Sequence, residues 1–591
     1  MLQVSAGDLK GNLNLRYFCL ISDYDGTLAR DGQVAPSTLE ALKRVKASGR
    51  KLVLATGREL PDLLNVFPEI GLFDLAVVEN GALLYNPATG EGRLLGEAPS
   101  AAFVEELRRR GVDPLSVGES IVATWHPHET TVLEVIRSLG LELQVIFNKD
   151  AVMILPSGVN KGTGVRIALD ELGFSTHNAL GVGDAENDHA FLGICECSVA
   201  VGNALPTLKD RADVVTAQTH GAGVEEIIEQ LLADDLCSLQ PRLKRHEILL
   251  GHAENGEKFC LGPYGTRVVV AGPSGGGKST VIMAIVERLI QKQYQICVID
   301  PEGDYDDFEQ FVTLGGAERI PGVSEILEIL KTAGSSISIN LLGVPLADRP
   351  SYFVGLLPRL QELRARAGRP HWIVIDEAHH LLPSELDSAN LSIPSSLGSF
   401  ALITVHPKSV SRALLDAVNC IIAIGPQPHT VIQEVNEGAA KQWAPPDQPA
   451  SGQPAPEVGS GEMLVWQAPE SNRPLRVTLE PAKVELRRHK RKYAAGELGQ
   501  DKSFYFRGAH GKLNLRAQNL NIFAQIAEGI DDETWLHHLK RSDYSQWFRQ
   551  AVKDENVAAE IAAIERDSTL QAGESRSRIL ETIRKHYSNP A

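Results

Sequence analysis

The feature that most constrains the fold is a repeated order of short, continuous apolar runs separated by amphipathic stretches of helical length. Near 15–235 the runs are 18–22, 51–56, 75–78 and 178–183. A second series, which starts near residue 245, has runs at 267–272, 294–300, 372–376, 401–405 and 420–425. Runs that are apolar at every position are typical of strands buried on both faces. The order therefore predicts two α/β domains, each with a doubly wound parallel sheet.

Composition along the chain indicates where these domains end. At about 100–200 residues per domain, 591 residues predict three to five domains. The Pro-rich stretch 444–460 indicates a linker or a long surface loop, and the apolar run 461–466 predicts a strand that returns to the second sheet. Residues 483–591 hold 19 Lys and Arg against 15 Asp and Glu, a net charge of +4, whereas the rest carries −21. We expect domains at 1–236, 240–482 and 483–591.

Composition also excludes several classes of protein. An apolar content of 43% with 23% charged residues is not that of a disordered or collagen-like chain. The net charge of −17 argues against a general nucleic-acid binder but leaves room for a local basic groove. Seven scattered cysteines without a CxxC pair indicate reduced thiols and neither a disulfide framework nor a zinc site. No apolar run approaches the roughly 20 residues that cross a bilayer, so we expect a cytoplasmic protein with no membrane partner.

The first apolar run leads into the motif DYDGTL, in which Asp23 and Asp25 lie two residues apart beside Gly26. Open α/β sheets bind ligands at the carboxyl ends of their strands. One carboxylate of such a pair can attack phosphorus to form an aspartyl-phosphate, while the other protonates the leaving oxygen and later deprotonates water. Taken alone, the motif has a second interpretation as a surface turn.

Further segments favour a phosphate site over a surface turn. Thr56 and Gly57 end the next strong strand and offer a hydroxyl and a backbone N–H to phosphate oxygens. Lys161 opens a predicted helix, where it can neutralise charge that develops on a phosphoryl group. The motif GDAEND (183–188) follows another strand, and its carboxylates with Asp23 form an all-oxygen site suited to Mg²⁺.

These motifs, with VVENGALLY (77–85) and VAVGNALPTLKDRADVVT (199–216), resemble the Cof-type branch of the haloacid dehalogenase (HAD) phosphatases over about 220 residues. The resemblance implies a small cap inserted near 85–155 and a small phosphorylated substrate, such as a sugar phosphate or phosphoglycolate. It implies that Asp23 is the nucleophile and Asp25 the general acid/base. It implies further that Thr56, Lys161 and Asn187 bind phosphate, and that Asp23, Asp184 and the Asp25 carbonyl bind the metal. Asp188 would be a metal-shell residue or would orient the lysine. His126 and His128 are better interpreted as part of a solvated turn.

The second series contains a phosphate-binding loop. The pattern GxxxxGK[ST] follows a predicted strand and opens a predicted helix, which is the context that the motif requires. It comprises Gly272, Pro273, Ser274, Gly275, Gly276, Gly277, Lys278 and Ser279, followed by Thr280. Successive N–H groups and the helix N-terminus cradle the phosphates of ATP, Lys278 bridges them, and Ser279 ligates Mg²⁺.

The apolar strand WIVI ends in Asp376 and Glu377, which supply the partner motif. Asp376 would hold Mg²⁺ through water, and Glu377 would polarise the attacking water. An acid directly after the aspartate favours an enzyme that hydrolyses ATP over a passive nucleotide sensor. The alternative is a strand that ends in a solvated acidic turn.

Together with VIDPEGDY (298–305) and ALITVHP (401–407), this domain resembles the HerA/FtsK-like, RecA-type ring ATPases over about 240 residues. The resemblance implies a homo-oligomer, with a hexameric ring as the arrangement to test. Thr404 and His406 occupy the sensor region, where many relatives have glutamine. The sequence does not choose an arginine finger among Arg359, Arg364, Arg366, Arg369 and Arg412.

The tail is expected to hold a basic linker and a small helical domain, with Trp535, Leu536, Leu539, Trp547 and Phe548 as a core stripe. The favoured function is a Mg²⁺-dependent phosphatase fused to an ATPase that regulates or assembles it. One alternative, in which DNA is a partner but is not favoured, is a translocase whose HAD domain trims phosphates. Another is an ATP-dependent scaffold that binds a phosphorylated signal.

Overall fold

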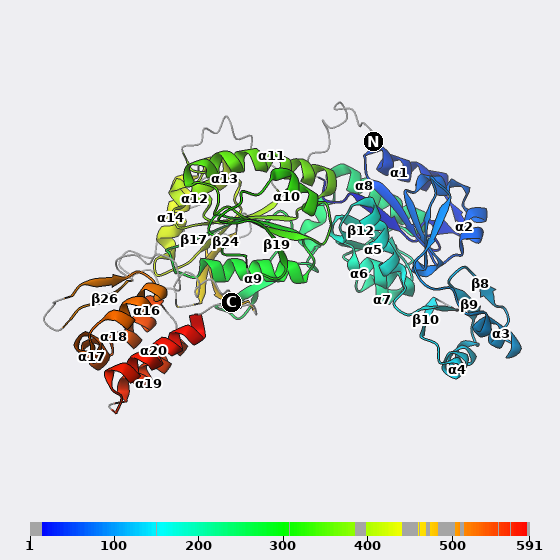
Figure 1. Ribbon diagram of the computed structural model, residues 1–591. Coiled ribbons are helices and arrows are strands. Elements are labelled where there is room, and N and C mark those ends of the chain that lie inside the picture. The colour runs from blue at the N-terminus through cyan, green and yellow to red at the C-terminus, as the bar shows by residue number, and fades with distance from the viewer. Residues whose placement is uncertain are drawn as a thin grey trace. The chain divides into compact units, whose positions relative to one another are not determined.

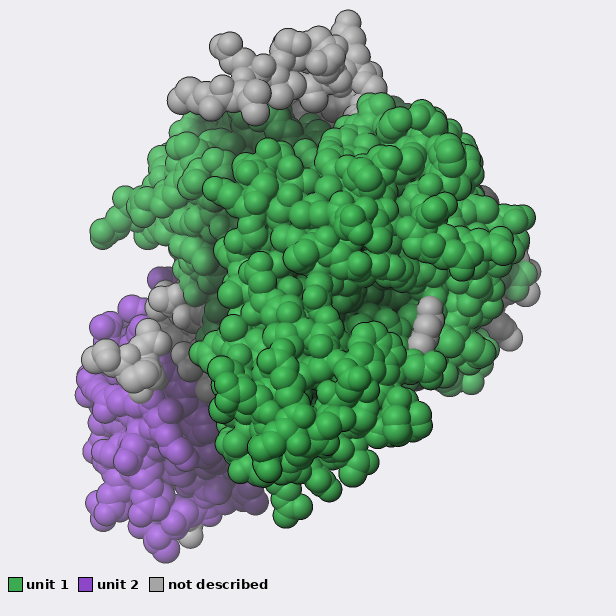
Figure 2. All heavy atoms as spheres, turned by 90° about the vertical axis from the view of Figure 1, so that its right-hand side faces the viewer, with its two compact units in different colours: residues 1–482 green, residues 483–591 purple. Residues whose placement is uncertain are grey.

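The computed structural model describes residues 15–148, 150–306, 308–384, 398–439, 459, 461–467, 473–482, 503–508, 513–552, 555–567 and 569–587. The chain forms two compact units, 1–482 and 483–591 (Figure 2). The predicted Pro-rich linker, apart from Gly459, and the basic run at 487–492 lie outside the described residues. Among the helices described, none has the length and apolarity to cross a membrane.

The first domain is built on an eight-stranded sheet of order β14-β13-β12-β1-β4-β5-β6-β7, in which neighbours from β14 to β5 are parallel. Its strands are β1 (Cys19–Ser22), β4 (Lys51–Ala55), β5 (Leu75–Val78), β6 (Leu83–Asn86), β7 (Glu91–Leu94), β12 (Ala179–Gly183), β13 (Cys197–Ala200) and β14 (Val214–Val215). Its main helices are α1 (Pro36–Ala47), α2 (Leu60–Val66), α5 (Lys161–Leu172), α6 (His189–Ile194), α7 (Pro206–Lys209) and α8 (His220–Asp234). Helix α1 packs against α8, and α5 packs against α6.

A smaller four-stranded antiparallel sheet of order β10-β11-β9-β8 forms the cap. Its elements are α3 (Ala101–Arg109), β8 (Ser116–Val117), β9 (Val122–Trp125), α4 (Glu129–Leu139), β10 (Leu143–Asn148) and β11 (Ala151–Pro156). The cap begins later than the expected residue 85, because β6 and β7 extend the main sheet as an antiparallel hairpin. The tight turn into β6 holds Glu79, Asn80 and Gly81 at positive φ.

The second domain is an eleven-stranded sheet of order β16-β15-β25-β24-β23-β17-β22-β21-β18-β20-β19, parallel from β23 to β19. Its strands are β15 (Ile248–Ala253), β16 (Lys258–Leu261), β17 (Arg267–Ala271), β18 (Ile296–Asp300), β19 (Phe311–Gly315), β20 (Ser336–Asn340), β21 (Trp372–Ile375), β22 (Ser399–Thr404), β23 (Cys420–Ala423), β24 (Glu462–Gln467) and β25 (Leu475–Leu479). Its helices are α9 (Lys278–Gln291), α10 (Val323–Leu330), α11 (Arg349–Ala367), α12 (Ala378–Leu381), α13 (Arg412–Ala417) and α14 (Pro428–Gly438). Figure 1 shows α9 on one face of the sheet and α11 on the other. The predicted α/β class with parallel sheets is confirmed.

The unit 483–591 has its own core and is mainly helical, as expected, with a short hairpin in addition. A hairpin of β26 (Phe504–Phe506) and β27 (Leu515–Ala517) precedes α16 (Leu520–Gly529), α17 (Asp532–Lys540), α18 (Asp543–Trp547), α19 (Glu555–Arg566) and α20 (Ala572–Tyr587). Phe504 and Phe506 are buried on alternate positions of β26, a period of two that only a strand produces. Trp535, Leu539, Trp547 and Phe548 lie in this core.

Candidate functional site

Four segments of the first domain bring the predicted phosphate residues to one edge of the sheet. Because β12, β1 and β4 are adjacent and parallel, the segments that follow them meet at their carboxyl ends. They carry Asp23 and Asp25 after β1, Thr56 and Gly57 after β4, and Asp184, Asn187 and Asp188 after β12; Lys161 is the first residue of α5. All are buried except Asp25, which is partly exposed, and Gly57, and the structure brings all eight together as the sequence predicts.

Lys161 joins two carboxylates at the centre of this site. Its Nζ donates to Asp23 Oδ1 at 2.6 Å and to Asp188 Oδ1 at 2.7 Å. Burial opposes the charge of Lys161, but the carboxylates of Asp188 and Asp23 outweigh it and raise the pKa of the ammonium. Burial, and then the Asp188 charge, raise the pKa of Asp23 well above its usual value, against the effect of Lys161. The site therefore favours a further cation.

The acidic cluster fits a hard divalent cation. Ligand atoms of Asp23, Asp184 and Asp188 all lie within 4.8 Å of one another, and all three side chains are buried. Three buried carboxylates against one lysine leave an excess of negative charge, and oxygen donors are those that Mg²⁺ prefers. Asp188 already accepts Lys161 on one oxygen and the amides of Asp184 and Ala185 on the other, at 2.8 and 2.9 Å. Asp23 and Asp184 are therefore the side chains better placed to ligate Mg²⁺.

Gly26 permits this close approach of the loop after β1. It has φ +86°, and a Cβ there would lie 2.4 Å from Asp184 Oδ2. Thr27 Oγ1 donates to Asp184 Oδ1 at 3.1 Å, which helps to fix that carboxylate. The glycine of the first motif is thus required by both its φ and its nearest neighbour.

Arg58 is a residue of the site to which the sequence assigned no role. Its Nε and one terminal nitrogen donate to the two carboxylate oxygens of Asp25, both at 2.7 Å, and another donates to Asp62 at 2.6 Å. These bonds raise the pKa of Arg58. The candidate acid/base is therefore held in an ion pair at the rim of the site. In the sequence Arg58 directly follows Thr56 and Gly57, but only the fold shows that it pairs with Asp25.

The cap supplies the remaining wall. A cavity of about 140 Å³ is lined by Asp23, Asp25, Thr56, Gly57, Arg58, Asn148, Met153, Lys161, Ala185 and Asn187. Asn148 and Met153 come from β10 and β11, and sequence reasoning selected neither, because alternation alone does not show which face of a cap strand meets a site. His126 and His128 do not line this cavity; His126 is exposed and His128 is partly buried.

The phosphate-binding loop joins β17 to α9 as the sequence predicts. Lys278 opens the helix, and its Nζ donates to the carbonyl oxygens of Gly272 and Pro273 at 3.0 and 2.9 Å. Gly272 has φ +157°, and a Cβ there would lie 2.4 Å from the carbonyl oxygen of Ile424. Ser279 follows within the first turn of α9. The backbone therefore has the strand–loop–helix form of a nucleotide site.

Asp376 and Glu377 follow β21 at the same edge of the sheet. Asp376 is buried and accepts the Glu377 amide at 2.9 Å, while Glu377 has φ +42°. His379 Nδ1 lies 3.5 Å from Glu377 Oε2 and 3.2 Å from Thr404 Oγ1. His379 therefore lies between Glu377 and Thr404, a residue of the predicted sensor region. The sequence did not indicate this arrangement. His406 contacts the His379 ring edge-on at 5.2 Å.

Asp300, at the end of β18, is a further acid of the second domain, and sequence reasoning did not select it. It is fully buried, and it accepts the amides of Glu302 and Tyr305 at 3.1 and 3.0 Å. Burial, with a contribution from Asp376, raises its pKa to about 7. Its run VIDPEGDY was noted only as a family feature.

The candidate arginine fingers differ in their surroundings. Arg364 donates to the carbonyl oxygens of Pro370, His371 and Ser399, and the buried Arg369 donates to those of Gly173 and Lys331. The guanidinium groups of Arg364 and Arg369 are therefore bonded to backbone carbonyl oxygens of their own chain. Arg359 and Arg366 are exposed beside Glu362, and Arg412 is exposed at the start of α13.

Two parts of the chain match known families. Residues 20–100 and 135–228 match the haloacid dehalogenase-like hydrolases, and residues 264–353 match the central domain of helicase HerA. The phosphoglycolate phosphatase of Methanothermobacter thermautotrophicus is 29% identical over 36% of this chain and 96% of its own length. That of Haloarcula marismortui is 32% identical over 35% of this chain and 95% of its own length. A solved haloacid dehalogenase-like hydrolase from Bacteroides thetaiotaomicron aligns to 36% of this chain and 100% of its own length, at 21% identity and a TM-score of 0.33.

Through its first domain, the chain belongs to the haloacid dehalogenase-like hydrolases. The relatives of that domain are phosphoglycolate phosphatases, and the second domain is of the HerA type. Both family resemblances expected from the motifs are confirmed. The break in the hydrolase match, 101–134, falls within the cap, which is the part of the domain that lines the outer wall of the site.

Proposed function

We propose that the first domain is a Mg²⁺-dependent phosphatase that acts through an aspartyl-phosphate on a small phosphorylated acid of the phosphoglycolate class. The observation that carries the proposal is the buried Asp23–Lys161–Asp188 contact at the floor of a cavity whose rim holds Asp25 and Arg58. The names of the relatives support the substrate class.

The chemistry follows from the residues present. Asp23 attacks phosphorus, the bond to the leaving oxygen breaks, and Asp25 gives that oxygen a proton. Asp25 then takes a proton from the water that hydrolyses the aspartyl-phosphate. Lys161, Asn187 and the Thr56 hydroxyl face the phosphoryl oxygens and stabilise their charge. Mg²⁺, held by Asp23 and Asp184, would neutralise the negative charge that gathers at phosphorus.

Arg58 gives a reason to favour an acid substrate over a sugar phosphate. Both carboxylate oxygens of Asp25 are engaged by Arg58, which keeps them from the leaving oxygen of the substrate. A carboxylate on the substrate would compete for the guanidinium and release Asp25 as the substrate binds. The cavity of about 140 Å³ also favours a small substrate.

Phosphate release from phosphoglycolate, glucose 6-phosphate and p-nitrophenyl phosphate tests this proposal. We expect phosphoglycolate to have the highest kcat/KM, EDTA to abolish activity, and Asp23→Asn to reduce kcat by at least ~100-fold. Asp31→Asn, a change at an exposed aspartate outside the cavity, is the matched control. Activity that survives Asp23→Asn would contradict the proposed nucleophile, and a preference for glucose 6-phosphate would contradict only the substrate class.

We further propose that the second domain hydrolyses ATP with Mg²⁺ and regulates or assembles the phosphatase as a homo-oligomer. Lys278 would bridge the phosphates, Ser279 and Asp376 would hold Mg²⁺, and Glu377 would polarise water. The strand–loop–helix geometry around Lys278 and the buried Asp376 at the same sheet edge support this proposal.

ATP turnover and phosphatase rate, measured together, test the second proposal. We expect Lys278→Ala to reduce ATP hydrolysis by at least ~100-fold, and ATP to change the phosphatase rate only in the wild-type protein. Because the matched family is a helicase domain, duplex DNA is added at low and moderate salt. Strong, salt-sensitive stimulation of ATP hydrolysis by DNA would replace regulation with a DNA-processing function.

A further inference from the structure

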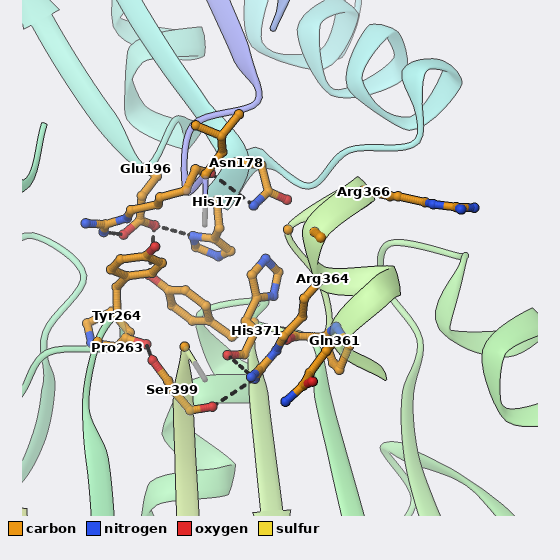
Figure 3. A pocket seen from close by; sticks show the side chains of 18 of the residues that line it. His177, Asn178, Glu196, Pro263, Tyr264, Gln361, Arg364, Arg366, His371 and Ser399 are labelled. Carbon is orange, nitrogen blue, oxygen red and sulfur yellow. Dashed lines mark hydrogen bonds and ion pairs between the residues drawn. The ribbon is translucent and has the colours of Figure 1, made fainter. Parts of the chain in front are cut away.

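A cavity of about 520 Å³ lies where the first domain meets the P-loop domain, within the unit 1–482 (Figure 3). The first domain contributes residues before β1, within η3 (Thr176–Asn178) and before β13. The P-loop domain contributes residues before β17, along α11 and before β21. The cavity shares no lining residue with the phosphatase cavity or the phosphate-binding loop. Its volume is that of a small-molecule site.

The walls of this cavity carry an excess of positive charge. Four arginines, Arg16, Arg267, Arg364 and Arg366, line it with two glutamates, Glu196 and Glu362. Arg16 pairs with Glu196, and Arg366 extends away from the cavity and pairs with Glu362, so the excess charge lies on Arg267 and Arg364 (Figure 3). Burial lowers the pKa of Arg364 to about 10 and also lowers the pKa of Arg267. An anion in the cavity would offset the cost of keeping these guanidinium groups charged.

Buried atoms without a hydrogen-bond partner also favour an anionic ligand. Among the lining residues that the structure describes, Arg16 Nε, Gln361 Nε2 and His371 Nε2 are buried without a hydrogen-bond partner. His371 Nδ1 accepts the Gln295 amide at 2.8 Å, so the ring proton is on Nε2 and that atom is a donor. All three atoms are therefore donors, which a ligand rich in acceptor oxygens would satisfy.

Another part of the wall is apolar. Leu15, Pro263, Pro358, Ala365 and Pro370 line the cavity beside the rings of Tyr264 and Tyr294. We propose that this cavity is a binding site for a small organic anion, one carboxylate or phosphate attached to an apolar or aromatic group. The proposal does not depend on either activity proposed above.

Such a ligand would touch elements that lead to both catalytic sites. Glu196 comes two residues after α6, the helix that follows the Asp184–Asp188 loop, and His371 immediately precedes β21, which leads to Asp376. The two domains are joined here, since the His177 ring stacks on Tyr294 at 3.7 Å and Glu196 accepts both His177 and the Tyr294 hydroxyl, at 2.6 and 2.8 Å. Figure 3 shows His177 and His371 facing one another from the two domains.

Calorimetric titration of the full chain with 2-naphthoate tests the proposal. We expect one saturable site per chain, and a Kd at least ~10-fold weaker for both 2-naphthalenemethanol, which has the ring without the charge, and acetate, which has the charge without the ring. Ala365→Trp fills the cavity and keeps every charge, and Arg364→Gln removes a lining cation; each should weaken 2-naphthoate at least ~10-fold. Ala365→Trp decides the result if Arg364→Gln fails to fold.

Arg359→Gln is the matched control, because it removes an exposed arginine of the same helix that does not line the cavity. It should leave 2-naphthoate binding unchanged, as should Asp23→Asn and Lys278→Ala, which alter the other two sites. No saturable binding, full binding by Ala365→Trp, or equal binding of 2-naphthalenemethanol would overturn the proposal.

Discussion

At the scale of single residues, Asp188 connects three parts of the phosphatase site. One carboxylate oxygen accepts Lys161, and the other accepts two consecutive amides of the loop after β12. Gly183 lies so close that a Cβ on it would be 2.7 Å from Asp188 Oδ2. The sequence left Asp188 between a metal-shell and a lysine-orienting role, and these contacts favour orientation of Lys161.

Replacement of Asp188 by Asn tests that role. An amide keeps the shape but has one acceptor oxygen, so either Lys161 or the loop amides lose a partner. We expect kcat to fall about 10–100-fold, as for other residues that orient a metal site from outside its ligand shell. The check is kcat against Mg²⁺ concentration, with Asp31→Asn as the surface control. An unchanged kcat would mean that Asp188 does not position Lys161.

Glu196 is a buried acid of the first domain whose carboxylate accepts hydrogen bonds from Arg16, His177 and Tyr294. Burial alone would raise its pKa, but Arg16, His177 and His246 lower it well below 4.5. A carboxyl group with a lowered folded-state pKa stabilises the fold above its unfolded-state pKa, and this contribution is lost as pH falls through the folded-state value.

We therefore expect Glu196→Gln to lower the free energy of unfolding by about 3 kcal/mol at pH 7, because it leaves Arg16 buried without its carboxylate. The difference from wild type should shrink as pH falls below 4.5. Urea unfolding between pH 3 and 7 measures it. Glu229→Gln, at an exposed pair with Arg44, should have little effect. A difference that stays constant with pH would rule out this ion pair as its source.

At the scale of elements, Glu79 ties the cap to the main sheet. Its buried carboxylate accepts the amides of Glu119, Ser120 and Ile121 at 3.0, 2.8 and 3.0 Å. The residue lies in the turn between β5 and β6, at positive φ. Sequence reasoning noted the string VVENGALLY for its resemblance and could not show this contact, since the cap loop is about 40 residues further along the chain.

Replacement of Glu79 by Gln should loosen the cap without unfolding the main sheet. Glutamine keeps one acceptor oxygen but turns the other position into a donor, so at least one of the three cap amides loses its partner. An unsatisfied buried donor costs about 1–3 kcal/mol, so amides within 116–156 should exchange at least ~10-fold faster. Hydrogen exchange with mass spectrometry compares them with β1 and β4, whose exchange should not change. Glu91→Gln, on the exposed strand β7, serves as control. Equal acceleration in β1 would show global rather than cap destabilisation.

At the scale of the whole molecule, residues 483–591 form a compact unit with a core of their own. Trp535 is fully buried, stacks on Tyr544 at 4.4 Å and donates from its indole nitrogen to Ser575 Oγ at 3.0 Å. The charge difference between this unit and the rest predicted a separate domain, and the hairpin was missed because its two strands are short.

We expect the fragment 483–591 to fold by itself and to unfold in one cooperative thermal transition, followed by near-ultraviolet circular dichroism. Trp535→Ala should lower its stability by about 3–5 kcal/mol, because the change removes a large buried side chain. Leu515→Ala, at an exposed position of β27, should have little effect. A gradual, non-cooperative transition of the wild-type fragment would contradict an independent core.

The sequence by itself determined the two α/β domains, their motifs and the positions of the candidate catalytic residues. Continuous apolar runs bury strands on both faces, and a parallel sheet then gathers whatever follows Asp23, Thr56 and Asp184 at one edge. Only the tertiary structure decided the partners of Arg58, the inner face of the cap strands, the contact of Thr404 with His379 and the cavity between the domains. These depend on side chains far apart in sequence that meet through packing, and no local periodicity encodes such meetings.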